Sequence, residues 1–102
     1  MVSRIGIRYN KTGKLALCCM GKCENAYINE WVEYHIAQGF DKIFIYDNND
    51  VDGERFEDVI GDYVKSGKCE IIDYRGRKCC QEEAYHDCYL KNNHDYDWIA
   101  VF

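Results

Sequence analysis

Three short polar clusters carry the side chains of this sequence that are best suited to binding a phosphorylated ligand. They lie at residues 21–25, 47–49 and 75–78, and each combines charged groups with amides or glycine. Carboxylates and amides bind the hydroxyl and N–H groups of a nucleoside, whereas guanidinium groups and helix N-termini bind phosphate. The clusters therefore predict a nucleotide-binding site. Its candidate residues are Lys22, Glu24, Asn25, Asp47, Asn48, Arg75, Arg77 and Lys78.

Each cluster directly follows a short apolar run that has the length of a buried strand. Stretches with apolar residues at helical spacing separate these runs, and Gly39 and Gly67 stand where two of the helices should end. The expected strands are 15–20, 42–47, 69–74 and 98–102, and the expected helices are 25–38, 56–66 and 79–92. This alternation is typical of an α/β fold, so we predict a Rossmann-like, mostly parallel sheet with helices on both faces.

The carboxyl ends of parallel strands meet at one edge of a sheet, and ligands of open α/β sheets bind there. We expect the four strands in the spatial order 3-2-1-4, because the three clusters must share that edge. The segment 4–9 and the turn 10–13 predict a further short strand or hairpin before the first strand. The strand at 98–102 is expected to leave its apolar outer edge unpaired, which favours self-association.

Length and charge limit the classes of function that fit. The chain has 102 residues, so we expect a single domain, 1–102. Its net charge is −5 and it has no long basic run, so nucleic acid is not an expected partner. The sequence shows neither a signal peptide nor an apolar segment long enough to span a membrane. We therefore expect a cytoplasmic protein, with peripheral membrane attachment left open for a longer enzyme.

The seven cysteines include two adjacent pairs and form no C-x-x-C motif. We expect mainly buried free thiols in a reducing compartment, in preference to disulfides or zinc ligands. Cys23 is the exception, because it lies beside Lys22 and near a helix N-terminus, where a thiolate is favoured. A nucleophilic pair of Cys23 with His35 is therefore an alternative, although His35 is more typical of a structural histidine.

Each polar cluster also has a simpler interpretation. Turns are polar in most proteins, and the side chain of Glu24 or Asn25 would cap the helix that follows. The sequence contains no dinucleotide fingerprint and no P-loop motif. Residues 50–53 resemble part of a calcium loop, but its twelfth position is Val59, so we assign no metal ligand within this chain.

A longer pattern joins the clusters to the elements around them. It comprises residues 20–31, 34–35, 39–41, 45–48, 73–77, 81, 84–85 and 87–88. In residue types, spacing and order it resembles the N-terminal, nucleotide-sugar-binding part of a family 2-like glycosyltransferase with the GT-A fold. The resemblance covers roughly residues 15–102 and implies that the chain is a fragment of a longer enzyme.

The resemblance also implies roles for individual residues. The first loop and the acid after the second strand would hold the base and ribose, here Lys22, Glu24 and Asp47. The basic segment 75–78 would meet the base edge or the diphosphate, and Gln81 would follow on the next helix.

The sequence departs from the pattern in two places. Cys23 stands where the family has asparagine or aspartate, which removes one hydrogen-bonding side chain. The D-x-D motif is absent because the sequence ends at Phe102. That motif holds a divalent cation, Mn or Mg, on the diphosphate. The cation is therefore expected in a full-length enzyme, with its ligands absent from this chain, and the catalytic residues are unknown.

The predicted function is transfer of a sugar from a nucleotide diphosphate sugar to an unknown sugar, lipid or protein acceptor. This chain would be the donor-binding domain and would be inactive by itself. Two alternatives stay open. One is a non-catalytic nucleotide-binding remnant or interaction module, and the other is a thiol-dependent Rossmann-like enzyme that uses Cys23.

Overall fold

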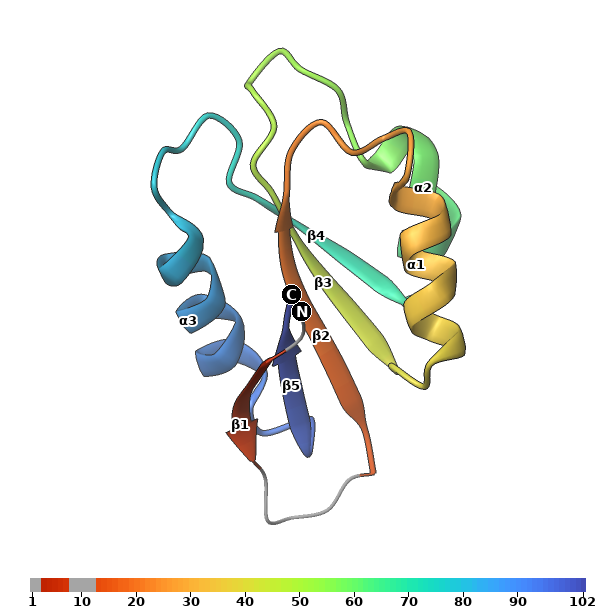
Figure 1. Cartoon of the computed structure of the whole chain (residues 1–102), viewed down its shortest axis with the longest axis vertical. Coiled ribbons are helices and arrows are strands. Elements are labelled where there is room, and N and C mark those ends of the chain that lie inside the picture. The colour runs from red at the N-terminus through yellow and green to blue at the C-terminus, as the bar shows by residue number, and fades with distance from the viewer. Residues whose placement is uncertain (1–2, 8–12) are drawn as a thin grey trace.

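A five-stranded sheet with three helices makes up the computed structural model, which describes residues 3–7 and 13–102 (Figure 1). The elements are β1 (Ser3–Ile7), β2 (Leu15–Gly21), α1 (Ile28–Ala37), β3 (Lys42–Asp47), α2 (Glu57–Lys65), β4 (Cys69–Asp73), α3 (Gln81–Asn92) and β5 (Trp98–Val101). Every strand and helix expected from the apolar patterns is present, and only the ends differ by a few residues.

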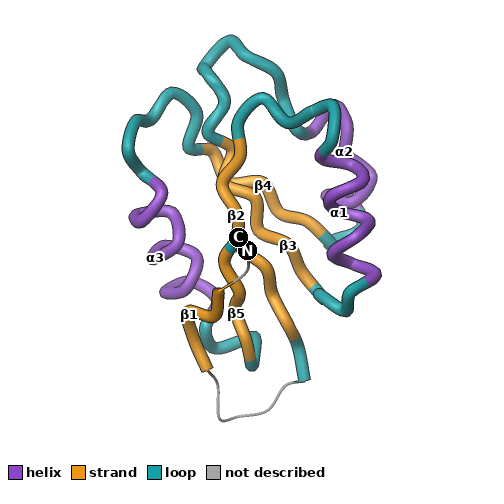
Figure 2. Tube along the Cα trace, viewed as in Figure 1, coloured by secondary structure: helices purple, strands orange, loops and turns teal. Residues whose placement is uncertain are grey.

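Four of the strands run parallel, in the order β4-β3-β2-β5. Numbered along the chain, these strands have the predicted order 3-2-1-4. The register pairs Gly21 with Asp47 and Asp47 with Asp73, so β2, β3 and β4 end at the same level. The loops that follow them gather at one end of the sheet, at the top of Figure 2. The predicted Rossmann-like α/β class and the shared edge are thus confirmed.

Strand β1 forms the outer edge of the sheet and pairs antiparallel with β5. Ser3 lies opposite Val101, and Ile7 lies opposite Trp98. The extra strand expected at 4–9 is therefore present, but it pairs with the last core strand and not with the first. The expectation that β5 has an unpaired edge is wrong, because β1 supplies backbone partners there, and self-association through that edge loses its basis. The turn expected at 10–13 lies almost wholly outside the described residues.

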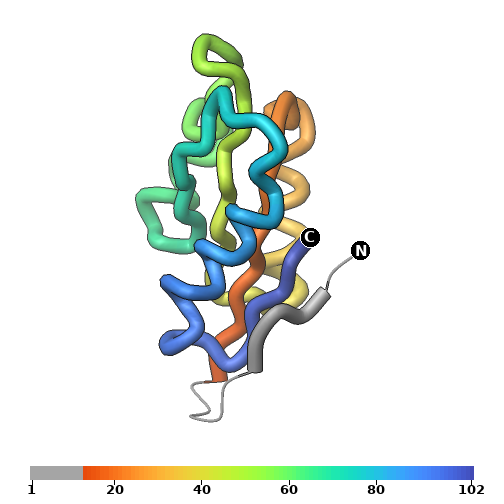
Figure 3. The backbone as a smooth tube through the Cα atoms, turned by 90° about the vertical axis from the view of Figure 1, so that its left-hand side faces the viewer, coloured from red at the N-terminus to blue at the C-terminus, as the bar shows by residue number. Residues whose placement is uncertain are grey.

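The two faces of the sheet are covered by different helices, as predicted. Successive side chains of a strand point to opposite faces, so Leu17 and Cys19 pack with α1 and α2, whereas Ala16 and Cys18 pack with α3. Figure 3 looks onto the α3 side, where this helix lies in front of the strands. The strands read as continuous apolar runs because both faces are buried.

The helix ends confirm one local prediction and correct another. Gly39 and Gly67 follow α1 and α2 with φ of +106° and +84°, a backbone conformation that glycine adopts without steric cost. The capping role considered for Glu24 and Asn25 is wrong, because the N-cap of α1 is Tyr27 and no side chain within residues 3–7 and 13–102 makes a capping hydrogen bond there. The backbone carbonyl of Glu24 instead accepts hydrogen bonds from the N–H groups of Tyr27 and Ile28.

Candidate functional site

The three loops at the carboxyl edge of the sheet are joined to one another by backbone hydrogen bonds. Asn48 N–H donates to the carbonyl of Gly21 at 2.9 Å, which ties the β3 loop to the end of β2. Gly76 N–H donates to the carbonyl of Asn49 at 2.9 Å, which ties the β4 loop to the β3 loop. The clusters at 21–25, 47–49 and 75–78 therefore form one continuous surface.

Asp47 and Arg75 form a buried ion pair beneath this surface. The Arg75 Nη1 and Asp47 Oδ2 atoms are 2.8 Å apart, and the two side chains are 8% and 2% exposed. The second carboxylate oxygen of Asp47 accepts hydrogen bonds from the backbone and side-chain N–H groups of Asn49. The sequence favours a solvated carboxylate at Asp47, and the structure corrects this because Arg75 and Asn49 bind the carboxylate within the protein.

The remaining donors of Arg75 hold the long loop between β3 and α2. Its guanidinium donates to the backbone carbonyls of Asp50, Gly53 and Glu54 at 2.7, 2.9 and 3.0 Å. Arg75 was expected to contact a base or a diphosphate, but its Nη groups are engaged within the protein. Its Nε is buried and has no hydrogen-bond partner among the described residues. Arg75 is therefore a structural anchor of the edge.

Asn48 and Asn49 connect the same loops through their side-chain amides. The Nδ2 group of Asn48 donates to the carbonyls of Tyr74 and Arg77 at 2.8 and 2.9 Å. Asn49 Oδ1 accepts from the backbone N–H of Cys23 at 2.7 Å, which fixes the β2 loop. Asn49 was not among the candidate site residues. The signal that could have found it is the Asp-x-Asn spacing, in which an aspartate accepts from a backbone N–H two residues on.

Asn25 also holds loops together. Its backbone N–H donates to Glu54 Oε1 at 3.0 Å, and its Nδ2 group donates to the carbonyl of Arg55 at 2.9 Å. Its Oδ1 atom is buried, and the part of the chain that the structure describes gives it no hydrogen-bond partner. Asn25 therefore connects the β2 loop to the start of α2.

Lys22, Arg77 and Lys78 are accessible cations of this edge. Lys22 Nζ lies 3.2 Å from Asp50 Oδ1, in an exposed pair. Arg77 lies over the ring of Tyr74 at 4.0 Å and contacts Glu83 at 3.5 Å. Exposed pairs of this kind contribute little to stability, so these cations can exchange their partners for a ligand phosphate.

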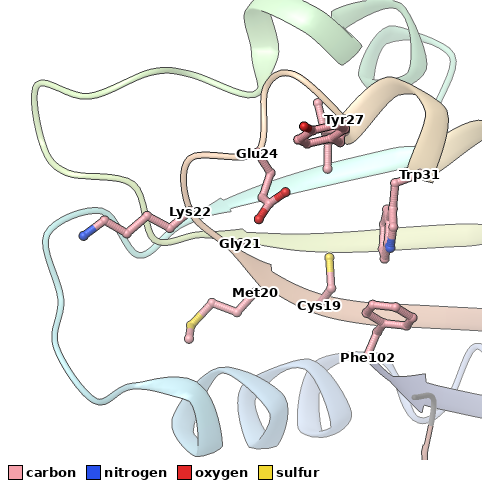
Figure 4. Close-up of a pocket in the computed structure, with 9 residues that line it drawn as sticks. Cys19, Met20, Gly21, Lys22, Glu24, Tyr27, Trp31 and Phe102 are labelled. Atoms are coloured by element: carbon pink, nitrogen blue, oxygen red, sulfur yellow. The ribbon is translucent and has the colours of Figure 1, made fainter.

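A cavity of about 270 Å³ opens beside the end of β2 (Figure 4). It lies between β2, the start of α1 and the end of β5. Its lining residues are Cys19, Met20, Gly21, Lys22, Glu24, Tyr27, Ile28, Trp31 and Phe102. Gln81 reaches the same region indirectly, because its Nε2 donates to the Tyr85 hydroxyl, which donates to the carbonyl of Phe102.

The structure separates the two members of the thiol pair that the sequence left open. Cys23 is exposed, with φ of +58°, and its N–H is held by Asn49. His35 is buried, its Nδ1 lies 2.8 Å from the carbonyl of Trp31, and its ring packs against the rings of Trp31 and Phe102. His35 is therefore a structural histidine, and the described residues give Cys23 no histidine base.

Five of the seven cysteines are buried free thiols, as expected. Burial raises the pKa of Cys19, and it raises the pKa of Cys69 to about 11. A hydrogen bond between Cys18 and Cys88 raises the pKa of Cys18 and lowers that of Cys88. These thiols act as apolar core side chains.

The described residues include no group of three or more histidine, cysteine or acidic side chains placed to hold a metal ion. The side chains at this edge thus do not fit the divalent cation that the family resemblance implies. The same part of the chain contains no helix that is long and apolar enough to cross a membrane.

The fold and the edge define an α/β protein of the Rossmann-like class, whose accessible polar groups lie at the carboxyl ends of parallel strands. Comparison with known families then identifies the family. The sequence model of glycosyltransferase family 92 matches residues 14–102, and the chain belongs to that family. The comparisons do not support the assignment to family 2, although both families consist of glycosyltransferases.

Two plant proteins illustrate the relationship. A glycosyltransferase family 92 protein of Oryza sativa subsp. japonica is 29% identical over 99 residues, which cover 91% of this chain. A family 92 protein of Ricinus communis is 28% identical over 93 residues, which cover 88% of this chain. The chain spans 16% of the length of each relative in these matches. No solved structure gives a significant match.

Proposed function

We propose that this chain forms the donor-binding part of a family 92 glycosyltransferase, which transfers a sugar from a nucleotide diphosphate sugar to an acceptor. The observation that carries the proposal is the joining of three loops into one edge with accessible cations above it. Phosphate binding at the ends of parallel strands is a recurrent property of open α/β sheets. Family membership adds a sugar donor and an acceptor as the substrates.

The residues of the edge have two different roles in this proposal. Asp47, Arg75 and Asn48 hold the loops in position, so they act on a ligand only through the backbone that they orient. Lys22 and Lys78 are exposed at the same edge and can meet a diphosphate, Lys22 by leaving its exposed pair with Asp50. Ammonium groups bind phosphate as compact point charges.

Two further expectations are part of the proposal. A divalent cation would neutralise charge on the leaving diphosphate, with its ligands supplied by residues outside this chain. We also propose a cytoplasmic location, because the five buried free thiols suit a reducing compartment.

Calorimetric titration of the chain with UDP and GDP tests the donor-binding role. Lys22→Ala and Lys78→Ala should each weaken binding by about 2- to 10-fold, the effect of losing a charged contact worth about 0.5–1.4 kcal/mol. The control is Lys65→Ala, because Lys65 is also exposed but lies at the C-terminal end of α2.

The alternatives predict different titrations. Equal weakening by Lys65→Ala would indicate unspecific attraction between the nucleotide and the cations. Absence of binding to either nucleotide would contradict the donor-binding role and favour a non-catalytic interaction module.

A further inference from the structure

The cavity beside α1 has room for one ring-sized group. Its volume of about 270 Å³ lies just below the range of roughly 300–1,000 Å³ that is usual for pockets of drug-sized ligands. A whole nucleotide diphosphate sugar exceeds this space. The cavity therefore accommodates one part of such a substrate, either the base or a sugar ring.

Three aromatic side chains from distant parts of the chain border the cavity. Tyr27 and Trp31 lie one helical turn apart at the start of α1, and Phe102 follows β5. The rings of Trp31 and Phe102 meet edge to face, with centroids 5.4 Å apart and an interplanar angle of 78°. Tyr27 and Phe102 are 67% and 44% exposed, so a ligand in the cavity can reach both rings.

The charged side chains of the cavity point in different directions. Figure 4 shows Glu24 extending into the space between Tyr27 and Cys19, whereas Lys22 extends away from it. The Lys22 ammonium instead lies beside Asp50. Glu24 thus brings a carboxylate, which only accepts hydrogen bonds, into a cavity that is otherwise mainly apolar.

These properties favour a sugar over a phosphate or a base. A carboxylate repels a phosphate, but it accepts hydrogen bonds from two hydroxyl groups at once. The edge of a base presents acceptors as well as donors, whereas Glu24 supplies only acceptors and Lys22, a cation among the lining residues, extends away from the cavity. The C–H groups on one side of a pyranose ring fit the electron-rich face of an aromatic ring.

We propose that the cavity lined by Glu24, Tyr27, Trp31 and Phe102 is a binding subsite for an uncharged pyranose ring of the substrate. This inference deepens the proposed function and rests on it. The diphosphate then lies on the Lys22 side of the β2 loop, and the sugar lies on the Glu24 side. The loop residues between them separate the anionic and the hydroxyl-bearing parts of the ligand.

Saturation-transfer NMR with methyl β-D-glucopyranoside and methyl β-D-galactopyranoside tests the subsite. Saturation of the aromatic protons should reach the sugar protons of at least one glycoside. Tyr27→Ala and Glu24→Gln should each reduce its apparent affinity about threefold or more. The matched control is Tyr34→Ala, because Tyr34 is 60% exposed on the same helix but does not line the cavity.

The outcomes separate this inference from the donor-binding role. Lack of transfer from the protein to either glycoside overturns the subsite, as does an equal loss in Tyr34→Ala. A UDP-induced shift of the Trp31 indole N–H, without a shift by either glycoside, assigns the cavity to the base. That result overturns the sugar subsite and leaves donor binding intact. Failure of UDP to bind at all is instead a failure of the proposed function.

Discussion

Asp47 and Arg75 show how polar residues near strand ends can hold the loops of a fold together. The carboxylate lies at the end of a buried strand, and the guanidinium covers it while binding three carbonyls of the next loop. A buried pair of this kind is worth little relative to apolar packing, but breaking it leaves one charge uncompensated. The edge therefore depends on both partners being present.

Replacing Asp47 with asparagine should destabilise the protein by about 3–5 kcal/mol, because the buried Arg75 charge loses its counter-ion. The free energy of unfolding in urea measures this change. Glu83→Gln is the control, because it breaks the exposed pair with Arg77 and should change stability by less than about 1 kcal/mol. Similar small changes in both variants would contradict the buried role of the pair.

The sequence placed Asp47 and Arg75 at the correct edge but did not indicate their structural role as a buried ion pair. The position follows from strand periodicity, which is a local pattern. The role depends on a partner that lies 28 residues away and on the path of the loop at 50–54, and no local pattern specifies either. The cavity was missed for a similar reason, since Phe102 meets Trp31 only after β5 has joined the sheet.

The loop between β4 and α3 depends on a glycine with a left-handed backbone. Gly76 has φ of +73°, and a Cβ atom built there would lie 2.8 Å from Cγ2 of Val51. The same residue donates its N–H to Asn49, so the strain would pass directly to the β3 loop. Close packing of two loops thus requires the smallest side chain at this position.

Gly76→Ala should destabilise the fold by about 1–2 kcal/mol or more, because the left-handed conformation and the Val51 contact both penalise a Cβ atom. Gly61→Ala is the matched control. Gly61 lies in α2, where a built Cβ meets no described atom within 4 Å beyond its chain neighbours and its own helix backbone, so alanine should stabilise the helix by about 0.5–1 kcal/mol. Thermal unfolding of both variants measures the difference, and shifts in the same direction would refute the packing argument.

The elements themselves were largely predictable from the sequence. A continuous apolar run such as 42–47 indicates a strand that is buried on both faces. An apolar stripe at helical spacing, such as that around Ile60, indicates a helix that is buried on one face. The partner of β1 was not predictable, because a short strand near a turn is equally compatible with a hairpin to β2. The structure pairs it with β5, a choice that is decided by tertiary contacts.

Across the whole molecule, buried acidic hydroxyl and thiol groups make stability depend on pH. Burial raises the pKa of Tyr46 and of Cys19, and it raises the pKa of Cys69 from 9.0 to about 11. Tyr46 also donates a hydrogen bond to Asp87 at 2.7 Å, which the ionised phenol would lose. All these groups hold their protons more tightly in the folded state than in the unfolded state.

Stability should therefore fall as the pH rises from about 9 to 11, because the unfolded chain releases these protons first. The stabilisation that comes from keeping these groups protonated is complete below pH 9, and it declines as the pH approaches their raised pKa values. Denaturation midpoints at intervals from pH 7 to pH 11 check this expectation. Cys69→Ala should make the loss of stability with rising pH shallower. If the loss is unchanged in this variant, ionisable groups other than Cys69 cause it.

The pairing of β1 with β5 also has a consequence during protein synthesis. β1 ends at Ile7, but its partner begins only at Trp98. A ribosome adds about 5–20 residues per second, so β1 waits about 5–20 s for the strand that completes its hydrogen bonds. β2, β3 and β4 emerge in sequence and can pair during that delay. The nascent chain thus carries an unpaired N-terminal strand for seconds, and chaperones that bind extended segments would find their substrate there.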